Sequence, residues 1–407
     1  MKKKVVIIGS GISGISAAIY LDKEKYDVTV LEKNLEPGGK IKTNYINGNT
    51  CEIGALYIVA KTNSKLLQLL QLNNIKSEQL FEYLYIIDDK PVIKIPPADQ
   101  LNLIFKMNNK MCALAETIDF NIDHPEYYMS AREFAIQQDV LLLYKFIEDN
   151  LKHYGYSGLS ECLAISFLLY FKSIGTKVQK ISNELGLTDI LNKLINCFNI
   201  NVRLNTNIIS INRDTKIITL ESNEEVTYDI LIMATDLKNI PNLYSCSELE
   251  TEIFNSTVNN PGISYNIEAL NNFDFLKVKL TNNDLNIYSF GFKYPGKYYG
   301  FSTAGNNIFY IYMKQDFNLS IDEHTEILKQ ELKPLFGDII IHDAKAWTHQ
   351  NSPTNEAIVN GFYGKVTNMQ GYKDTYYAGE AFTYALLSSC HDYAEMIVNK
   401  YLNVKEI

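Results

Sequence analysis

A glycine-rich run near the start of the chain has the residue types and the spacing of a phosphate-binding turn. In Gly9-Ser10-Gly11-Ile12-Ser13-Gly14, the first glycine allows a tight turn and the second lets the backbone approach a pyrophosphate. The third lets a helix pack closely on a strand, and the N–H groups at the start of that helix would face the phosphate charge. Glu32 is placed to accept both ribose hydroxyls of an adenosine, and its carboxylate would repel a ribose phosphate. The pattern predicts a site for an adenine dinucleotide.

The glycine run needs a strand before it and a second strand that leads to the acid. The apolar pattern predicts a strand over Lys4–Ile8, a helix over Ser13–Leu21 and a strand over Val28–Leu31. These elements form the opening βαβ unit of a doubly wound parallel sheet. Lysines before an apolar run are also typical of a secretion signal. However, the glycines interrupt the run and no cleavage site of small residues follows, so we expect no signal.

Two later motifs extend this site and point to a family. Gly38-Gly39-Lys40 follows the acid, where its backbone N–H groups and the lysine charge would meet the phosphates. Gly54-Ala55 comes next, and Tyr377-Ala378-Gly379-Glu380 lies near the C-terminus. In this order the motifs resemble those of the FAD-dependent amine oxidase, phytoene desaturase and protoporphyrinogen oxidase superfamily.

The resemblance implies that the cofactor is FAD. It implies that Gly379 and Glu380 meet the pyrophosphate and ribityl part of FAD, and that the following helix points its N-terminus at the flavin ring. A helix dipole in that place stabilises the negative charge of a reduced flavin. The backbone at Val202 would contact the adenine. The predicted cofactor residues are Gly9, Gly11, Ile12, Ser13, Gly14, Glu32, Lys33, Gly38, Gly39, Lys40, Ile41, Gly54, Ala55, Leu56, Val202, Ala234, Gly379 and Glu380.

Within this superfamily the chain is most similar to the bacterial polyunsaturated fatty acid double-bond isomerases. The supporting stretches are Gly38–Gly54 and Tyr363–Gly371, the latter running into Tyr376–Glu380. The resemblance implies that a hydride passes from a doubly allylic carbon to flavin N5 and returns to another carbon, with no net redox change. The flavin would carry the chemistry, so no catalytic side chain is predicted. Such a reaction needs a dry, apolar tunnel that holds the reacting carbon in place.

The expected fold class is α/β, a Rossmann-like FAD-binding domain with an interleaved antiparallel β substrate domain and a helical cap. We expect the FAD-binding domain at 1–78, 181–238 and 347–407, the substrate sheet at 79–96 and 239–346, and the cap at 97–180. Further helices are predicted over Leu66–Leu72, Ser130–Gln138, Asp139–Tyr154, Leu159–Phe171, Leu187–Phe198, His324–Leu335 and Tyr384–Tyr401. Further strands are predicted over Tyr83–Ile87, Val92–Ile95, Asn201–Leu204, Ile208–Arg213, Ile217–Glu221, Tyr228–Ala234, Gly262–Asn266, Leu285–Gly291, Phe309–Met313, Ile339–His342 and Thr375–Ala378.

Aromatic side chains are the candidates for the substrate site. Phe167, Tyr170 and Phe171 lie in one predicted helix and would line or gate a lipid tunnel, although an aromatic stripe at helical spacing is more often core. Tyr384 follows the predicted flavin-binding Gly-Glu pair, and Tyr57 follows Gly54-Ala55. These two tyrosines are the predicted neighbours of the flavin.

The amino-acid composition argues against several classes of function. The 407 residues carry 38 basic and 47 acidic side chains, a net charge of −9, and only three arginines. Such a chain is a poor nucleic-acid binder. Six dispersed cysteines and six dispersed histidines predict neither disulfides nor a metal site. Apart from the glycine-interrupted run at the N-terminus, the longest apolar run is Leu159–Phe171, which is too short to span a bilayer, so we expect a soluble, cytoplasmic protein. Its oligomeric state is not predicted.

The scarcity of arginine bears on the substrate. Arginine is the usual anchor for a fatty acid carboxylate, and Gln79–Asp88, where the substrate sheet would begin, contains no basic residue. Either a lysine, such as Lys90, Lys94 or Lys106, or a hydroxyl group anchors the carboxylate. Otherwise the substrate is not a free fatty acid. Two other functions stay open, namely an FAD-dependent oxidase or desaturase of an amine or polyene, and a flavin-binding partner protein without turnover.

Overall fold

The computed structural model describes residues 1–403 except 57, 59–63, 75–76, 80–83, 88–89, 93–97, 153–161, 175–178, 182–184, 271–286, 291–297 and 306–307. Its helices are α1 Ile12–Tyr20, α2 Lys65–Leu72, α3 Ala98–Glu116, α4 Ala131–Gln137, α5 Leu141–Lys152, α6 Ala164–Ile174, α7 Leu187–Cys197, α8 Glu248–Asn255, α9 Ile321–Phe336, α10 Asn355–Val359, α11 Phe362–Met369 and α12 Leu387–Tyr401. Its first strands are β1 Lys3–Ile8, β2 Tyr26–Leu31, β3 Thr43–Ile46, β4 Asn49–Glu52, β5 Ser77–Gln79, β6 Leu84–Ile87, β7 Lys90–Val92, β8 Gln179–Ile181 and β9 Asn201–Arg203. The remaining strands are β10 Ile208–Asn212, β11 Ile217–Leu220, β12 Glu225–Thr227, β13 Ile230–Met233, β14 Thr257–Ala269, β15 Ile287–Phe290, β16 Tyr298–Gly305, β17 Ile308–Lys314, β18 Ile339–Pro353 and β19 Thr375–Tyr377.

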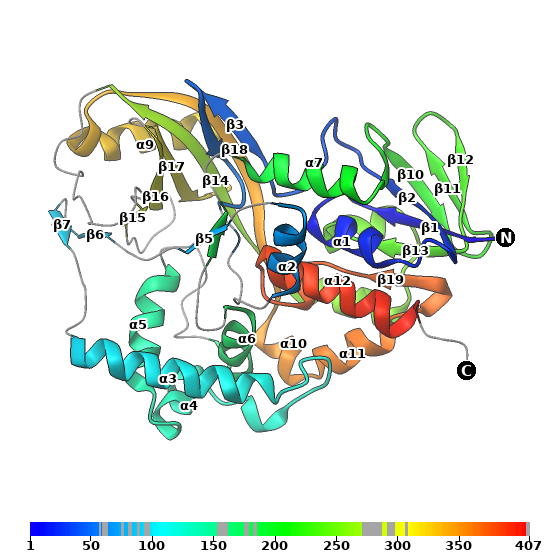
Figure 1. The fold of residues 1–407 in the computed structure, drawn as a ribbon, viewed down its shortest axis with the longest axis horizontal. Coiled ribbons are helices and arrows are strands. Elements are labelled where there is room, and N and C mark those ends of the chain that lie inside the picture. The colour runs from blue at the N-terminus through cyan, green and yellow to red at the C-terminus, as the bar shows by residue number, and fades with distance from the viewer. Residues whose placement is uncertain are drawn as a thin grey trace.

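A parallel sheet of five strands, in the order β19-β13-β1-β2-β9, organises one half of the molecule (Figure 1). Its neighbouring strands all pair in parallel, and Val5, Ile7 and Leu231 are fully buried in it. Apolar runs of this kind suit a parallel sheet that is covered on both faces. The carboxyl ends of parallel strands meet at one edge, which is where doubly wound proteins bind nucleotides. The α/β prediction is confirmed.

A second, larger sheet lies beside the first. Its order is β18-β14-β17-β16-β15-β6-β7, and its neighbouring strands are antiparallel except for β15 and β6. Helix α9 covers one face, where Leu328, Leu332 and Phe336 join Ile263 and Tyr265 in a buried cluster. The alternation of apolar residues along β14 places Ser264 and Asn266 on the opposite face. That second face looks towards the parallel sheet.

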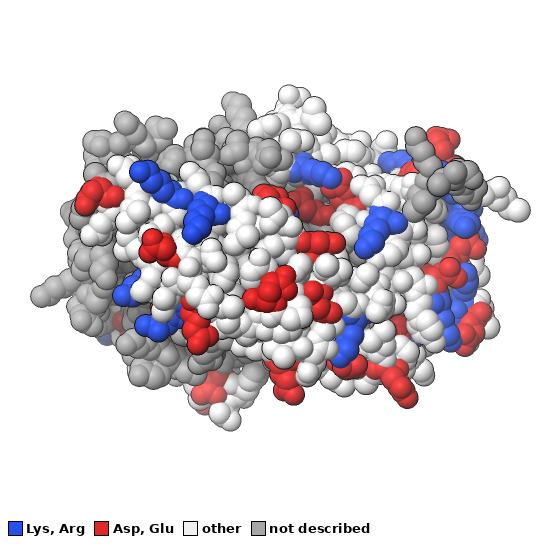
Figure 2. Space-filling model, turned by 90° about the horizontal axis from the view of Figure 1, so that it is seen from below, with Lys and Arg blue, Asp and Glu red and all other residues white. Residues whose placement is uncertain are grey.

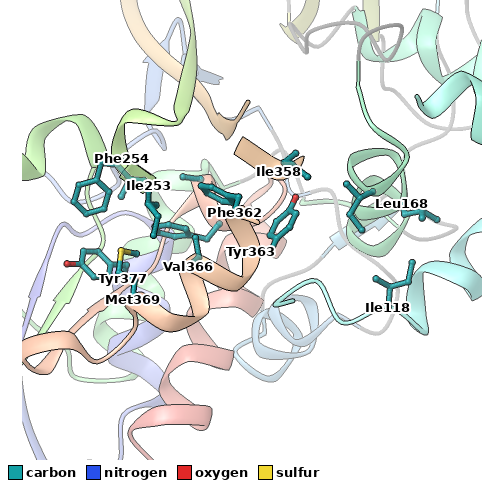
Figure 3. Packing of buried hydrophobic residues seen from close by; sticks show 14 of the residues in the cluster. Ile118, Leu168, Ile253, Phe254, Ile358, Phe362, Tyr363, Val366, Met369 and Tyr377 are labelled. Atoms are coloured by element: carbon teal, nitrogen blue, oxygen red, sulfur yellow. The ribbon is translucent and has the colours of Figure 1, made fainter. Parts of the chain in front are cut away.

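Helices α3 to α6 form the third part of the molecule and share a core with the parallel sheet. A single buried cluster runs from Ile118 and Leu168 in the helical part, through Phe362 on α11, to Tyr377 on β19 (Figure 3). The helical part is therefore continuous with the sheet and has no separate core. None of the helices in the described ranges is both long and apolar enough to cross a membrane. Figure 2 shows the lower side of Figure 1, where acidic and basic side chains alternate with neutral ones over the part that is described.

Several predicted element boundaries are wrong. Strand β18 continues to Pro353, well beyond the predicted Ile339–His342, because β14 pairs with it along its length. The last helix begins at Leu387 and not at Tyr384, since a short 3₁₀ turn at Glu380–Phe382 comes first. The patterns also missed the β3–β4 hairpin and helices α8, α10 and α11. For α8 the signal was present, because Ser247 and Glu250 form a capping box.

Helix α11 depends on a residue from the helical part for its N-terminal cap. Its N-cap residue is Gly361, which has no side chain to accept a hydrogen bond. The carboxylate of Asp123 takes that role and accepts from the N–H of Gly364 at 3.2 and 3.3 Å. A Cβ on Gly364 would lie 2.4 Å from an oxygen of Asp123, so this glycine makes room for the cap.

We expect Asp123→Ala to lower the free energy of unfolding by about 1 kcal/mol, the usual cost of a lost helix cap. Urea unfolding of the purified protein measures this. Asn368→Ala, at an exposed position of the same helix, is the control and should leave the midpoint unchanged. Equal midpoints for the two variants would contradict the capping role of Asp123.

Candidate functional site

The glycine run forms the turn between β1 and α1. The φ angle of Gly9 is 101°, a conformation in which a side chain is strained. A Cβ on Gly9 would lie 2.6 Å from the carbonyl oxygen of Ala234, and a Cβ on Gly14 would lie 2.0 Å from that of Gly9. Packing of the turn requires both glycines. At Gly11, the N-cap of α1, the nearest atoms to a Cβ are 3.8 Å away, so there is space beside the first N–H groups of the helix.

The second glycine pair lies against this turn. The N–H of Gly38 donates to the carbonyl oxygen of Ser10 at 3.1 Å, and a Cβ on Gly39 would lie 3.2 Å from the Cα of Gly11. The φ angles of Gly38 and Gly39 are 142° and 61°. Two loops that are separate in the sequence thus form one backbone surface at the carboxyl edge of the parallel sheet. Such a surface lets a phosphate approach N–H groups closely.

Glu32 directly follows β2 at the same edge and is 5% exposed. Its Oε2 accepts from the N–H of Ser10 at 2.9 Å and from the hydroxyl of Ser10 at 2.7 Å. Its Oε1 accepts from the N–H of Asn34 at 2.9 Å and from the side-chain amide of Asn34 at 2.8 Å. Each oxygen has one fixed backbone donor and one side-chain donor that can rotate away. The carboxylate can therefore take two ribose hydroxyls in place of the side-chain donors.

Glu380 brings together residues from three distant parts of the chain. Its Oε1 forms an ion pair with the ammonium of Lys40 and accepts from the N–H of Asn351 on β18 at 2.9 Å. Asn351 is 4% exposed, and its Oδ1 has no hydrogen-bond partner among the described residues. Beside it, a Cβ on Gly379 would meet nothing within 4 Å. Open space next to an unpartnered buried acceptor fits a ligand that brings hydroxyl donors, as the ribityl chain of FAD does.

Three more of the predicted cofactor residues make backbone contacts near the carboxyl edge of the parallel sheet. Val202 on β9 pairs with Val30, and Ala234 follows β13 with its N–H donating to Ile8 at 2.9 Å. A Cβ on Gly54 would lie 2.0 Å from the carbonyl oxygen of Lys40. These residues lie with the glycine loops at the carboxyl edge.

The other predicted cofactor residues differ in how deeply their side chains are buried. Ile41 belongs to the buried cluster of Ile15 and Leu187, so its side chain packs in the core. Lys33 is exposed, whereas Ser13 at the start of α1 is buried. Ile12, Ala55 and Leu56 are half-buried, and the N–H of Ala55 donates to Lys40 at 2.9 Å.

The predicted substrate residues differ in burial. Phe167 is fully buried, Phe171 is 1% exposed, and their rings meet at a centroid distance of 4.8 Å. They are core residues of the helical part. Tyr170 on α6 and Tyr384 are half-buried, and their rings meet edge to face at 5.7 Å. Tyr57 lies outside the described residues.

Trp347 and Tyr310 of the second sheet contact the backbone at Ile53 and Gly54, and Ser264 contacts Tyr310. The sequence patterns did not single out Tyr310 or Ser264. The indole N–H of Trp347 donates to the carbonyl oxygen of Ile53 at 2.7 Å. The hydroxyl of Tyr310 contacts the hydroxyl of Ser264 at 2.9 Å and the carbonyl oxygen of Gly54 at 3.5 Å. Alternation along β14 was the available signal for Ser264, but it does not say which face of the strand meets the rest of the protein.

Two titratable groups near the loops are held neutral by burial. Burial raises the pKa of Cys390 to about 12, and a hydrogen bond to Ser13 places this thiol beside the start of α1. Burial likewise raises the pKa of Tyr310 to about 12. Neither group is ionised near neutral pH, so neither is an activated nucleophile. Within the described ranges no group of three histidine, cysteine or acidic side chains has the arrangement of a metal site.

Comparison with known proteins agrees with this geometry. Residues 7–71 match the family model of an NAD(P)-binding Rossmann-like domain. The 1-hydroxycarotenoid 3,4-desaturase of Flavobacterium sp. (strain P99-3) is 28% identical over 188 residues, covering 44% of this chain and 36% of that protein. The zeta-carotene-forming phytoene desaturase of Myxococcus xanthus is 22% identical over 162 residues, covering 40% and 29%. The chain thus aligns with about a third of the length of these relatives.

Solved structures share the whole fold. The CLA-producing fatty acid isomerase from P. acnes superimposes with a TM-score of 0.80 at 16% identity, covering 98% of this chain and 99% of that one. A putrescine oxidase superimposes with a TM-score of 0.65 at 14% identity, covering 98% and 99%. At these identities the likeness concerns the fold. The chain therefore contains a Rossmann-like dinucleotide-binding unit and has the same fold as these two enzymes.

Proposed function

We propose that the protein binds FAD along the carboxyl edge of the parallel sheet and isomerises a double bond of a polyunsaturated fatty acid, with no net redox change. The observation that carries this proposal is the contact between Tyr170 and Tyr384. It joins α6 of the helical part to the segment that follows Gly379 and Glu380, so that two half-buried aromatic rings lie between them. An enzyme that acts on a polyene needs an apolar wall next to its flavin.

The residues of the site fit FAD. The start of α1, with the space at Gly11, would hold the pyrophosphate, and Glu32 the adenosine ribose. Glu380 and Asn351 would hold the ribityl chain. When bound there, FAD supplies a hydride acceptor at its N5 atom. The chain's own task is to hold the polyene beside the flavin and to exclude water.

The protonation states near the site suit hydride transfer. Tyr310 and Cys390 stay protonated, because burial raises the pKa of each to about 12. Lys40 and Glu380 neutralise each other in an ion pair. None of these four groups is therefore a free general base at neutral pH. Moving a hydride from one carbon to another requires no side-chain base, which supports isomerisation.

Two of the three arginines form ion pairs with glutamates, which limits the choice of anchor for a substrate carboxylate. Arg203 forms a two-pronged ion pair with Glu224 at 2.8 and 2.7 Å, and Arg213 pairs with Glu250 in the interior. Arg132 on α4 is exposed. Of the lysines named as possible anchors, Lys106 is exposed on α3, and Lys94 lies outside the described residues. Lys90 begins β7, and nothing is described of its side chain.

Oxidation or desaturation of a polyene or amine is the second candidate. It is favoured by the sequence relatives, which are carotenoid desaturases, and by the likeness in fold to a putrescine oxidase. It uses the same fold but leaves the substrate with two electrons fewer. A flavin-binding role without turnover is the third candidate.

The deciding experiment supplies the FAD-loaded protein with linoleic acid or its methyl ester, and records conjugated-diene absorbance together with oxygen consumption. Isomerisation gives dienes without oxygen consumption or lasting loss of flavin absorbance. Stoichiometric hydrogen peroxide with no isomer overturns the proposal and favours an oxidase. Bound flavin with no change in the substrates tested favours the non-catalytic role. A preference for the free acid over the ester reveals whether the carboxylate is anchored.

We expect Tyr384→Leu to raise KM for the polyene about two- to tenfold, because the polyene would lose its contact with the Tyr384 ring, and a contact with an aromatic ring contributes about 0.5–1.5 kcal/mol. Steady-state kinetics of diene formation measure this change. Tyr384→Phe keeps the ring that meets Tyr170 and is the control, with an expected KM close to that of the original protein. An unchanged KM in the leucine variant would remove Tyr384 from the substrate site.

A further inference from the structure

The stretch Tyr363–Gly371 contains a residue that holds the flavin-binding segment from the side. Gln370 follows α11 and lies against β19, which is the edge strand of the parallel sheet. Its Oε1 accepts from the N–H of Tyr377 at 2.8 Å, and its Nε2 donates to the carbonyl oxygen of Tyr377 at 3.2 Å. The side-chain amide thus pairs with the backbone of β19 as a neighbouring strand would.

Gln370 also contacts the helix on the other side of the flavin-binding segment. Its side chain lies near the hydroxyl of Tyr393 on α12. The ring of Tyr393 stacks on Phe382 at a centroid distance of 5.8 Å and an angle of 23°. Tyr377 precedes Gly379 and Glu380, and Phe382 and Tyr393 follow them. One amide therefore connects both ends of the segment.

The segment between β19 and α12, which contains Gly379 and Glu380, has little regular structure to hold it in place. Between the end of β19 and the start of α12 it forms only one short 3₁₀ turn, and Gly379 has open space beside it. On its other side Tyr377 is paired with Met233 of β13, and the N–H of Ala378 donates to Met233 at 3.0 Å. Without Gln370 the sheet would hold the segment from one side only.

We propose that Gln370 is a positioning residue for FAD, and that it acts by fixing Gly379 and Glu380 through β19 and α12. This inference rests on the FAD site proposed above. It predicts that loss of the amide weakens FAD binding and changes the environment of the flavin more than it changes the stability of the FAD-free protein.

Gln370→Met tests this, because methionine has about the same length as glutamine but makes neither backbone hydrogen bond. FAD affinity is measured from the fluorescence of released FAD, and the flavin reduction potential by dye equilibration. We expect FAD affinity about tenfold weaker, as for two lost hydrogen bonds, and a shifted potential. Lys365→Ala is the matched control, since it removes an exposed ion pair with Glu252 from the same helix. It should alter neither quantity.

Tyr393→Phe is a milder second variant that removes only the hydroxyl contact, and it serves if Gln370→Met does not fold. It should weaken FAD binding less, in the same direction. The inference is overturned if folded Gln370→Met or Tyr393→Phe protein binds FAD with unchanged affinity and potential. It is also overturned if Lys365→Ala shows the same losses. If the original protein bound no FAD, the proposed function would fail instead, and a protein that bound FAD without isomerising a substrate would leave this test intact.

Discussion

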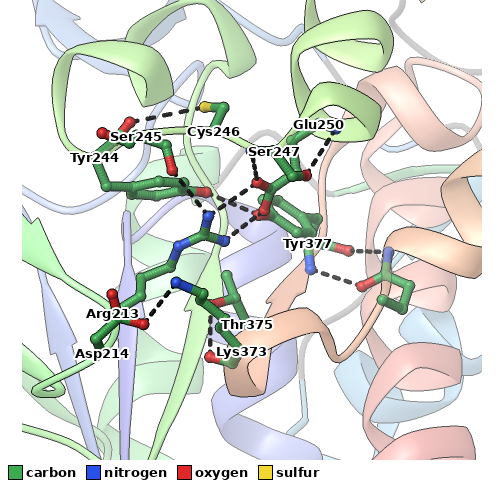
Figure 4. Close-up of polar contacts among 11 residues, drawn as sticks. Arg213, Asp214, Tyr244, Ser245, Cys246, Ser247, Glu250, Lys373, Thr375 and Tyr377 are labelled. Atoms are coloured by element: carbon green, nitrogen blue, oxygen red, sulfur yellow. Dashed lines mark hydrogen bonds and ion pairs between the residues drawn. The ribbon is translucent and has the colours of Figure 1, made fainter.

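Replacing Glu250 by alanine is expected to destabilise the protein by about 3–5 kcal/mol, because it leaves the charge of Arg213 buried without its partner. Glu250 is fully buried and Arg213 is 7% exposed. The guanidinium donates to both carboxylate oxygens of Glu250, with its Nη2 2.9 Å from Oε2 (Figure 4). Urea unfolding measures the loss.

The rest of the network in Figure 4 explains why both charges are tolerated in the interior. Nη2 of Arg213 also donates to the carbonyl oxygen of Ser245 at 3.1 Å, and its guanidinium lies 4.1 Å from the ring centre of Tyr244. Glu250 accepts from the hydroxyl of Tyr377 and from the N–H of Ser247 at 2.7 Å. Burial raises the pKa of Tyr377, which keeps its hydroxyl a donor. Buried charges need this degree of hydrogen bonding.

An exposed ion pair provides the matched control. Glu224 pairs with Arg203 by the same two-pronged geometry but at the surface, where such pairs contribute little. Glu224→Ala should therefore leave the urea midpoint almost unchanged. Similar losses for Glu224→Ala and Glu250→Ala would contradict the role that we assign to burial.

The same pair predicts how stability depends on pH. Burial alone would raise the pKa of Glu250, but hydrogen bonds from Arg213, Tyr377 and Ser247 bring it below its ordinary value. A carboxyl with a lowered pKa in the folded state contributes stability that is present above its unfolded pKa, about 4.3, and is lost as the pH falls through the folded value. Urea midpoints measured at falling acidic pH should decline, and Glu250→Gln should flatten the decline.

The second large effect concerns cofactor binding. We expect Gly11→Ala to reduce FAD affinity by a factor of about one hundred or more, because its methyl group would enter the space beside the pyrophosphate site, where the backbone must approach closely. The FAD-free protein should keep its stability, since the nearest atoms to that methyl are 3.8 Å away and Gly11 has a φ angle of −68°. Fluorescence titration with FAD, together with urea unfolding of the FAD-free protein, separates the two effects.

Gly14→Ala is the contrasting variant. Its methyl group would lie 2.0 Å from the carbonyl oxygen of Gly9, so here the fold itself should suffer. If Gly11→Ala bound FAD as well as the original protein does, the pyrophosphate would not lie at this turn. If Gly11→Ala lost as much stability as Gly14→Ala, the space beside α1 would be filled by the chain itself.

Local chemistry made part of this site predictable. The glycine run and Glu32 directly follow consecutive strands of a βαβ unit, so the types and spacing of residues close in sequence decide their geometry. The same holds for Gly38 and Gly39, whose positive φ angles a glycine pair permits. The order of these motifs was enough to predict the superfamily, although the middle of the chain matches it mainly in layout.

The helical spacing of aromatic residues did not separate core residues from candidates for the substrate site. Phe167, Tyr170 and Phe171 share one helix and one pattern, but only Tyr170 meets Tyr384, while the other two pack in the core. Spacing along a helix reports which residues share a face, and it does not report what that face meets.

The sequence by itself determined the class of fold and the dinucleotide turn, because both rest on short-range turn chemistry and on buried apolar strands. Only the tertiary structure decided which distant residues meet. It placed Asn351 beside Glu380, Gln370 along β19, and Glu250 against Arg213. Such contacts arise from the order of strands and the packing of helices, which no local pattern encodes.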